Sequence, residues 1–216
     1  MNDIEIAGKL TIQDWIDLEN KLKPNYNHYW NEAYNFFELR ICTRYLKPLN
    51  AILNMKSYKG EGFAVVNLQC SLIEMIESFI NGWIYIHKPR GWYKNEQKLE
   101  VMNNACIFKS FFANRNGVKN MKIDGGDFYA SVRCGLLHET QTKNNWKIRK
   151  GLSDGYAYEE KDGFKILYRD NFQRDLENLI QKYKYSIING VEFDGIPASE
   201  LRENFIAKFN HICHES

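Results

Sequence analysis

Apolar residues recur at intervals of three and four along most of this chain, which is the pattern of helices packed against a core. The most apolar segment runs from Phe63 to about Trp83, and another runs from Tyr29 to Leu46, where Pro48 is expected to break or kink it. Shorter periodic segments are expected over 12–22, 99–112, 172–189 and 201–212. Thr11 and Asp14 form a capping-box pattern at the first of these. The pattern predicts a mainly α-helical fold.

The period changes to two after residue 146, which predicts strands. Segments 146–149, 156–159 and 164–168 alternate, and Lys161-Asp162-Gly163 links the last two as a hairpin turn. We expect a small antiparallel sheet at about 146–168, with helices at about 171–213 covering a single domain that spans 1–216. Segment 84–97 combines cations with rings. It is interpreted as an irregular loop anchored by buried rings, the alternative being a surface that stacks nucleic-acid bases.

A narrow polar line runs along the apolar segment 63–83, through Asn67, Ser71, Glu74, Ser78 and Asn81. It is either a solvated strip or a seam that faces a charged group. In the second case Glu74 is the candidate partner of Arg133, because a carboxylate would offset and orient a buried guanidinium. Glu77 lies off this line and could do the same.

Composition is that of an ordinary soluble protein: 216 residues with a net charge of +2. The five cysteines lack CxxC spacing, the amino terminus is acidic, and no apolar run approaches the roughly 18 to 20 residues of a membrane span. We therefore expect reduced thiols, a cytoplasmic location and no membrane partner. Phosphate-binding glycine motifs and paired metal-ligand clusters are not found, so we expect no cofactor and no metal. RNA contacts would need a local basic cluster, which Lys143, Lys147, Arg149 and Lys150 supply.

Candidate chemistry lies in segment 128–139, where Arg133 and His138 interrupt an apolar stretch. Arginine can hold two phosphate oxygens, and histidine exchanges a proton near neutral pH. On an α-helix these side chains would lie about 140° apart around the axis and about 7.5 Å apart along it. Either the helix unwinds past Gly135, or two chains combine the residues across a two-fold axis. In a purely structural alternative, Arg133 pairs with an acidic residue, and His138 and Glu139 end the helix.

The segment Arg133-Cys134-Gly135-Leu136-Leu137-His138 resembles the R-x4-6-H motif of the HEPN superfamily, and the flanking Tyr129 and Val132 fit too. The resemblance implies an up-and-down helical bundle, a homodimer and metal-independent endoribonuclease activity in a toxin-antitoxin or phage-defence setting, with an antitoxin or nucleotidyltransferase as partner. Arg133 and His138 would be catalytic, supported by Glu74, Tyr129, Cys134 and Glu139. Active members often carry Asn, Asp or His after the arginine, whereas this chain has Cys134. The alternative is an inactive HEPN-like module that binds RNA or protein.

Overall fold

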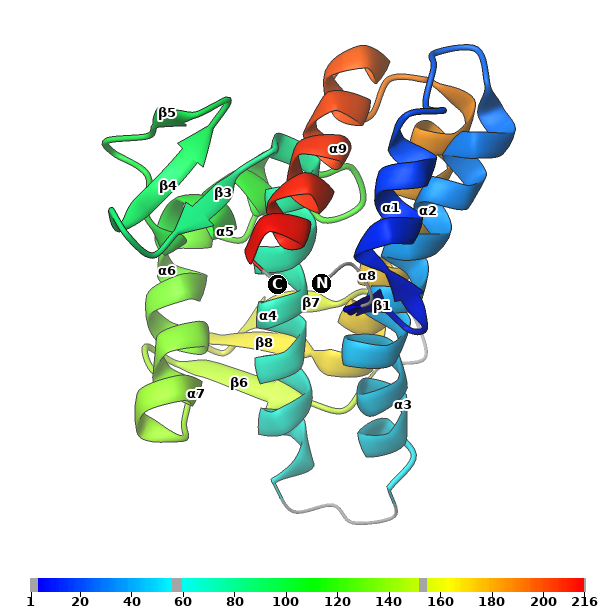
Figure 1. Ribbon diagram of the computed structural model, residues 1–216. Coiled ribbons are helices and arrows are strands. Elements are labelled where there is room, and N and C mark those ends of the chain that lie inside the picture. The colour runs from blue at the N-terminus through cyan, green and yellow to red at the C-terminus, as the bar shows by residue number, and fades with distance from the viewer. Residues whose placement is uncertain (1–3, 56–59, 152–154, 216) are drawn as a thin grey trace. The chain divides into compact units, whose positions relative to one another are not determined.

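The computed structural model describes residues 4–55, 60–151 and 155–215, and its fold is mainly α-helical, as the apolar periodicity predicts (Figure 1). The chain forms two compact units. Unit 1 takes the described parts of Met1–Lys47, Ser78–Met102 and Gln181–Ser216, and unit 2 takes those of Pro48–Glu77 and Asn103–Ile180. Helices α4 (Glu61–Asn81) and α8 (Arg169–Asn189) contribute residues to both units.

Unit 1 is built around an aromatic core. Its further elements are β1 (Glu5–Ala7), β2 (Leu10–Thr11), α1 (Ile12–Glu19), α2 (Asn27–Ile41), β3 (Ile84–Ile86), β4 (Gly91–Lys94), β5 (Gln97–Lys98) and α9 (Ala198–Glu215). The predicted capping box of Thr11 and Asp14 is present at the start of α1. Trp15 stacks on Phe209 with ring centroids 4.5 Å apart, and Phe37 lies edge-on to Phe79 at 4.9 Å. These contacts hold α1, α2, α9 and the end of α4 together.

A break at Pro48, one of the two outcomes that the sequence predicts, is not found. Helix α2 passes through a π-helical turn, η1 (Cys42–Leu46), directly into α3 (Lys47–Leu53). The N–H of Lys47 donates to the carbonyl of Cys42, and Pro48 follows as the second residue of α3. Proline has no N–H to donate, and the wider π-turn directly before it changes the hydrogen-bond pattern at the point where this donor is missing.

The irregular loop predicted for 84–97 is also wrong, because this segment forms the three-stranded antiparallel sheet β3-β4-β5. Tyr85 lies opposite Trp92 in the strand register, and their rings are 5.3 Å apart. Tyr85 is exposed rather than buried. The strands are only two to four residues long, too short for alternation to be recognised.

Unit 2 places its helices beside a second sheet. Its further elements are α5 (Asn104–Asn114), the 3-10 turn η2 (Lys119–Met121), α6 (Gly125–Phe128), the π-helical turn η3 (Tyr129–Arg133), α7 (Cys134–Glu139), β6 (Trp146–Arg149), β7 (Tyr158–Lys161) and β8 (Phe164–Tyr168). Phe128 lies at the centre of the core, with Phe112 and Trp146 at centroid distances of 4.9 and 5.4 Å.

The predicted β7–β8 hairpin is confirmed, but the prediction of a wholly antiparallel sheet is wrong. The strand order is β6-β8-β7, and β6 runs parallel to β8. Strand β8 comes last in the sequence but lies between β6 and β7. It is antiparallel to its hairpin partner β7, whereas β6 runs in the same direction as β8.

Helix α4 is the one helix in the described residues that is long and apolar enough to cross a membrane. Most of this span is buried inside the protein. Such burial is that of the core helix of a soluble protein.

Candidate active site

The segment that carries Arg133 and His138 is one continuous helical column made of α6, η3 and α7 (Figure 1). The side chain of Asp124 caps it by accepting the N–H groups of Gly126 and Asp127. An added Cβ at Gly125 would lie 2.4 Å from the carbonyl oxygen of Phe108, so α6 packs directly on the backbone of α5. The column therefore begins from a fixed position.

The helix does not unwind past Gly135, so the first of the two arrangements expected for Arg133 and His138 is wrong. After the π-turn, α7 continues through Gly135 to Glu139 and ends at Thr140 in a left-handed conformation. Position 135 requires glycine because the chain after α7 folds back against it. An added Cβ at Gly135 would lie 2.5 Å from the carbonyl oxygen of Gln141. Arg133 and His138 thus follow α-helical geometry, about 140° apart around the axis.

Arg133 and Glu74 form the ion pair expected for a polar seam on α4. Nε of Arg133 donates to Oε1 of Glu74 at 2.8 Å, and both side chains are about one-fifth exposed. Desolvation lowers the pKa of Arg133, but Glu74 more than offsets it, so the pKa is raised. The guanidinium carbon lies 5.7 Å from the centre of the Tyr129 ring. Arg133 is therefore held in one orientation as a cation.

The Nη atoms of Arg133 have no hydrogen-bond acceptor among the residues that the structure describes. Only Nε is used by Glu74. Neither Nη atom is among the fully buried side-chain atoms that lack a partner, so the Nη edge is accessible to a ligand. This edge has the fork geometry that binds two phosphate oxygens.

His138 is exposed in the last turn of α7 and, within the described part of the chain, forms no hydrogen bond or ion pair. Its neighbour Glu139 pairs with Lys143, four residues later in the loop that follows α7. The imidazole of His138 is therefore accessible to a substrate or to a second protein surface.

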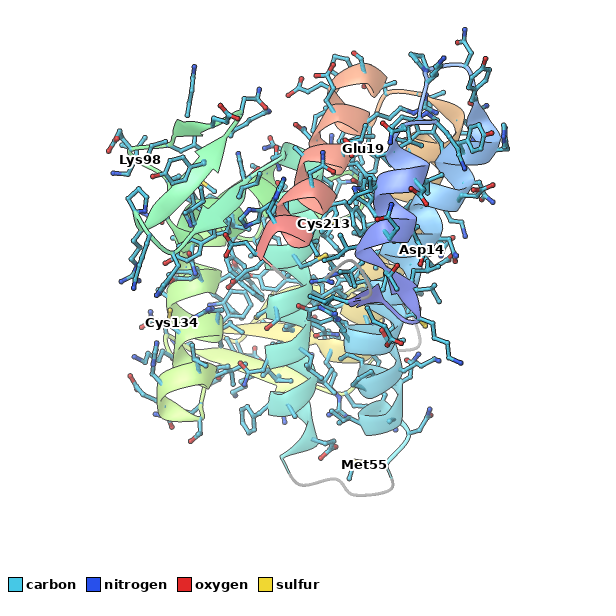
Figure 2. The ribbon with its side chains drawn as sticks, viewed as in Figure 1. Asp14, Glu19, Met55, Lys98, Cys134 and Cys213 are labelled. Atoms are coloured by element: carbon cyan, nitrogen blue, oxygen red, sulfur yellow. The ribbon has the colours of Figure 1, made fainter. Side chains whose placement is uncertain are left out.

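Cys134, labelled in Figure 2, is the first residue of α7. Burial raises the pKa of the Tyr129 hydroxyl, and a hydrogen bond with Cys134 raises it further. Cys70, fully buried on α4, has its thiol pKa raised by desolvation and by the charge of Glu74. The raised pKa values of Tyr129 and Cys70 keep both groups uncharged at neutral pH, so neither competes with Glu74 for Arg133.

Asp127 is a central residue that the sequence analysis does not single out. Its carboxylate accepts hydrogen bonds from Ser131 at 2.7 Å, Trp146 at 2.9 Å and Lys165 at 2.6 Å. It thereby ties the motif column to β6 and β8. Helical spacing relates Asp127 to Ser131, four residues later, but no sequence pattern relates it to Trp146 or Lys165.

The four basic residues predicted to bind RNA have different surroundings in the structure. Lys143 is paired with Glu139, and the ammonium of Lys147 lies over the Phe164 ring. Arg149 and Lys150 instead line a cavity at the start of α4. RNA binding by these four residues stays a prediction.

Glu77, the second candidate partner of Arg133, pairs with Arg115 instead. The two contacts, 2.8 and 3.1 Å long, make a bidentate pair that is almost fully buried, and Ser110 adds a hydrogen bond of 2.6 Å. Glu77 is therefore committed to the core of unit 2.

Within the described residues, no three His, Cys, Asp or Glu side chains are placed to hold a metal ion. No protein family, curated protein or solved structure was found to match the chain.

Proposed function

We propose that this protein is a metal-independent endoribonuclease of the HEPN type, built on a HEPN-like helical bundle. The observation that carries the proposal is the state of Arg133: Glu74 orients it through Nε, while the Nη edge is accessible and bonded to no described residue. An arginine kept only for structure would be expected to have its donors used inside the fold. This one keeps its phosphate-binding edge available.

In the proposed reaction, the RNA 2′-hydroxyl attacks the adjacent phosphorus and the bond to the 5′-oxygen breaks. Arg133 stabilises the negative charge that develops on the phosphate oxygens. His138 transfers a proton, either from the attacking hydroxyl or to the leaving oxygen. The products carry a 2′,3′-cyclic phosphate and a 5′-hydroxyl.

The angular separation of Arg133 and His138 on one straight helix favours a site shared between two chains. A homodimer would supply Arg133 from one protomer and His138 from the other across a two-fold axis. The exposure of His138 fits this arrangement. An antitoxin or nucleotidyltransferase partner, in a toxin-antitoxin or phage-defence setting and in the cytoplasm, belongs to the same proposal.

One observation favours a second function, an inactive HEPN-like module that binds RNA or protein. Cys134 stands directly after the arginine, and its thiol is bonded to Tyr129. A thiol is a weak donor and cannot orient a phosphate as an amide or carboxylate would.

The deciding experiment incubates purified protein with a structured RNA in the presence of a chelator. We expect cleavage by the wild type and loss of cleavage in Arg133→Ala and in His138→Ala, with cyclic-phosphate ends and no cleavage of DNA. His87→Ala is the matched control, because His87 is also exposed but lies on another element. Its activity should equal that of the wild type.

Circular dichroism and size-exclusion chromatography establish that each variant is folded and in the same oligomeric state. Cleavage that persists without His138, or that disappears with the chelator, contradicts the proposal. RNA binding without cleavage by folded wild type supports the second function instead.

A further inference from the structure

Unit 2 contains a cavity of about 260 Å³ that no residue of the motif column lines. It is formed by the start of α4, the end of β6 and the start of α8, and its charged residues are Glu61, Arg149, Lys150 and Arg169. Three cations against one carboxylate give the lining side chains a net charge of +2, which becomes +1 when Asp170, an ion-pair partner of Arg169, is included. The cavity therefore favours an anion.

Arg169 forms the inner wall of the cavity, with a side chain only 6% exposed. Its Nη2 donates to Glu61 at 3.2 Å and its Nε to Asp170 at 3.2 Å. Nη1 has no acceptor among the described residues. One guanidinium nitrogen at the cavity wall is thus free to bind a ligand.

Two long helices begin at residues that line the cavity: α4 at Glu61 and α8 at Arg169. Each has 21 residues, so each presents the positive end of a helix dipole there. In the described part of the chain, no acceptor is bonded to the backbone N–H of Glu61 or Gly62. These donors are arranged as in helix ends that bind phosphate.

Gly62 brings the α4 backbone close to Arg169. A Cβ at this position would lie 3.1 Å from Nη1 of Arg169 and 3.4 Å from a methyl carbon of Ile148. The missing side chain therefore leaves the first-turn amides and the guanidinium side by side. A tetrahedral oxyanion can accept from both at once, whereas a halide has a single centre.

We propose that this cavity binds a phosphate group, with Arg169 and the first amides of α4 as inner donors and Arg149 and Lys150 at the entrance. The phosphate is either inorganic phosphate or a phosphate of RNA. The site is independent of Arg133 and His138, so it stands whether or not the protein cleaves RNA.

The test is a titration of ¹⁵N-labelled full-length protein with inorganic phosphate, followed by NMR at constant ionic strength. We expect saturable shifts of the Gly62 amide and of the Arg169 Nε resonance. Chloride at the same ionic strength should not produce them. Absence of saturable shifts, or equal shifts with chloride, overturns the proposal.

Arg149→Ala/Lys150→Ala is the diagnostic variant, because both residues are exposed and the buried Arg169 stays in place. Removing two charged contacts should weaken phosphate binding by about tenfold or more. Lys119→Ala/Lys182→Ala, which removes two exposed lysines elsewhere, should bind as the wild type does. Equal weakening in both variants means a general charge effect and overturns the site.

Two short RNAs then identify the source of the phosphate. An RNA with a 5′-phosphate and its 5′-hydroxyl counterpart are titrated against the Arg133→Ala protein, in which the proposed cleavage is disabled. Preference for the 5′-phosphate assigns a terminal phosphate, and equal shifts assign the RNA backbone. If neither RNA moves the Gly62 and Arg169 signals but inorganic phosphate does, the site takes the free anion.

Discussion

The carboxylate of Asp127 links the motif column to β6 and β8, and replacing it should remove a part of the stability that depends on pH. Desolvation raises the pKa of Asp127, but hydrogen bonds from Lys165, Ser131 and Trp146 outweigh it and hold the pKa at about 2. Because the folded pKa lies below the ordinary value of 3.8, the ionised form stabilises the fold by ~2 kcal/mol at neutral pH. Asp127→Asn should lose about this free energy of unfolding.

The stabilisation by ionised Asp127 is fully present above about pH 4. It disappears as the pH falls toward 2, where the carboxylate of the folded protein also takes up a proton. Urea unfolding of both proteins from neutral to acidic pH measures it. Asp162→Asn, the same chemical change at an exposed hairpin turn, should leave stability within about 0.5 kcal/mol of the wild type. A difference that stays constant with pH would show that Asp127 acts through packing rather than charge.

For single residues, the sequence predicted a side-chain contact correctly where that contact depended on one face of one helix. The polar line on α4 placed Glu74 beside Arg133, and that ion pair is present. The polar line did not predict the partner of Glu77, because Arg115 lies outside any recognisable pattern and contacts Glu77 only through the packing of α5 on α4. Trp146 and Lys165, two of the three partners of Asp127, could not be predicted for the same reason, because they meet its carboxylate through tertiary contacts that periodicity does not encode.

Among the elements, α7 depends on Gly135, its second residue. An alanine at Gly135 would place its Cβ 2.5 Å from the Gln141 carbonyl, and a backbone atom cannot move aside as a flexible side chain can. Overpacking of this kind costs about 1–3 kcal/mol, and the gain in helix propensity returns about 1 kcal/mol. We expect Gly135→Ala to lower the free energy of unfolding by about 1–2 kcal/mol in urea denaturation.

Gly62→Ala is the matched control, because it is also a helical glycine but its nearest neighbour is the end of the Arg169 side chain at 3.1 Å. That side chain can yield, so the variant should be neutral or more stable by up to about 1 kcal/mol. Equal destabilisation of both variants would mean that the contact with Gln141 is not what requires glycine at 135.

Element types were predictable where the apolar pattern was long, as in α4 and the two carboxyl-terminal helices α8 and α9. The two π-turns, 42–46 and 129–133, were not, since one added residue per turn leaves little trace in a pattern of threes and fours. The parallel pairing of β6 with β8 was also hidden, because it depends on where the chain crosses between strands. The π-turn at 129–133 matters most for the site, since Arg133 is its last residue and the turn sets the angle at which that side chain leaves the column.

For the whole molecule, the positions of Arg133 and His138 in one chain leave open whether they act within that chain or across two chains. Arg133 is fixed by Glu74, and His138 lies five residues farther along an uninterrupted helix. If both act on one phosphate, a second chain is the simplest way to bring them together. A shared site and a site within one chain predict different results when inactive variants are mixed.

In a shared site, Arg133→Ala and His138→Ala protomers complement each other. A heterodimer of the two has one site with both substitutions and one site with an intact Arg133 and an intact His138. Random exchange makes half of the dimers heterodimers, so the mixture should recover about a quarter of wild-type activity, although neither variant is active alone. The measurement is RNA cleavage after the two proteins are unfolded together and refolded, compared with each protein refolded separately. No recovery from a mixture shown to contain heterodimers would place both residues in a site within one chain, and would require Arg133 and His138 to act from different sides of the same helix.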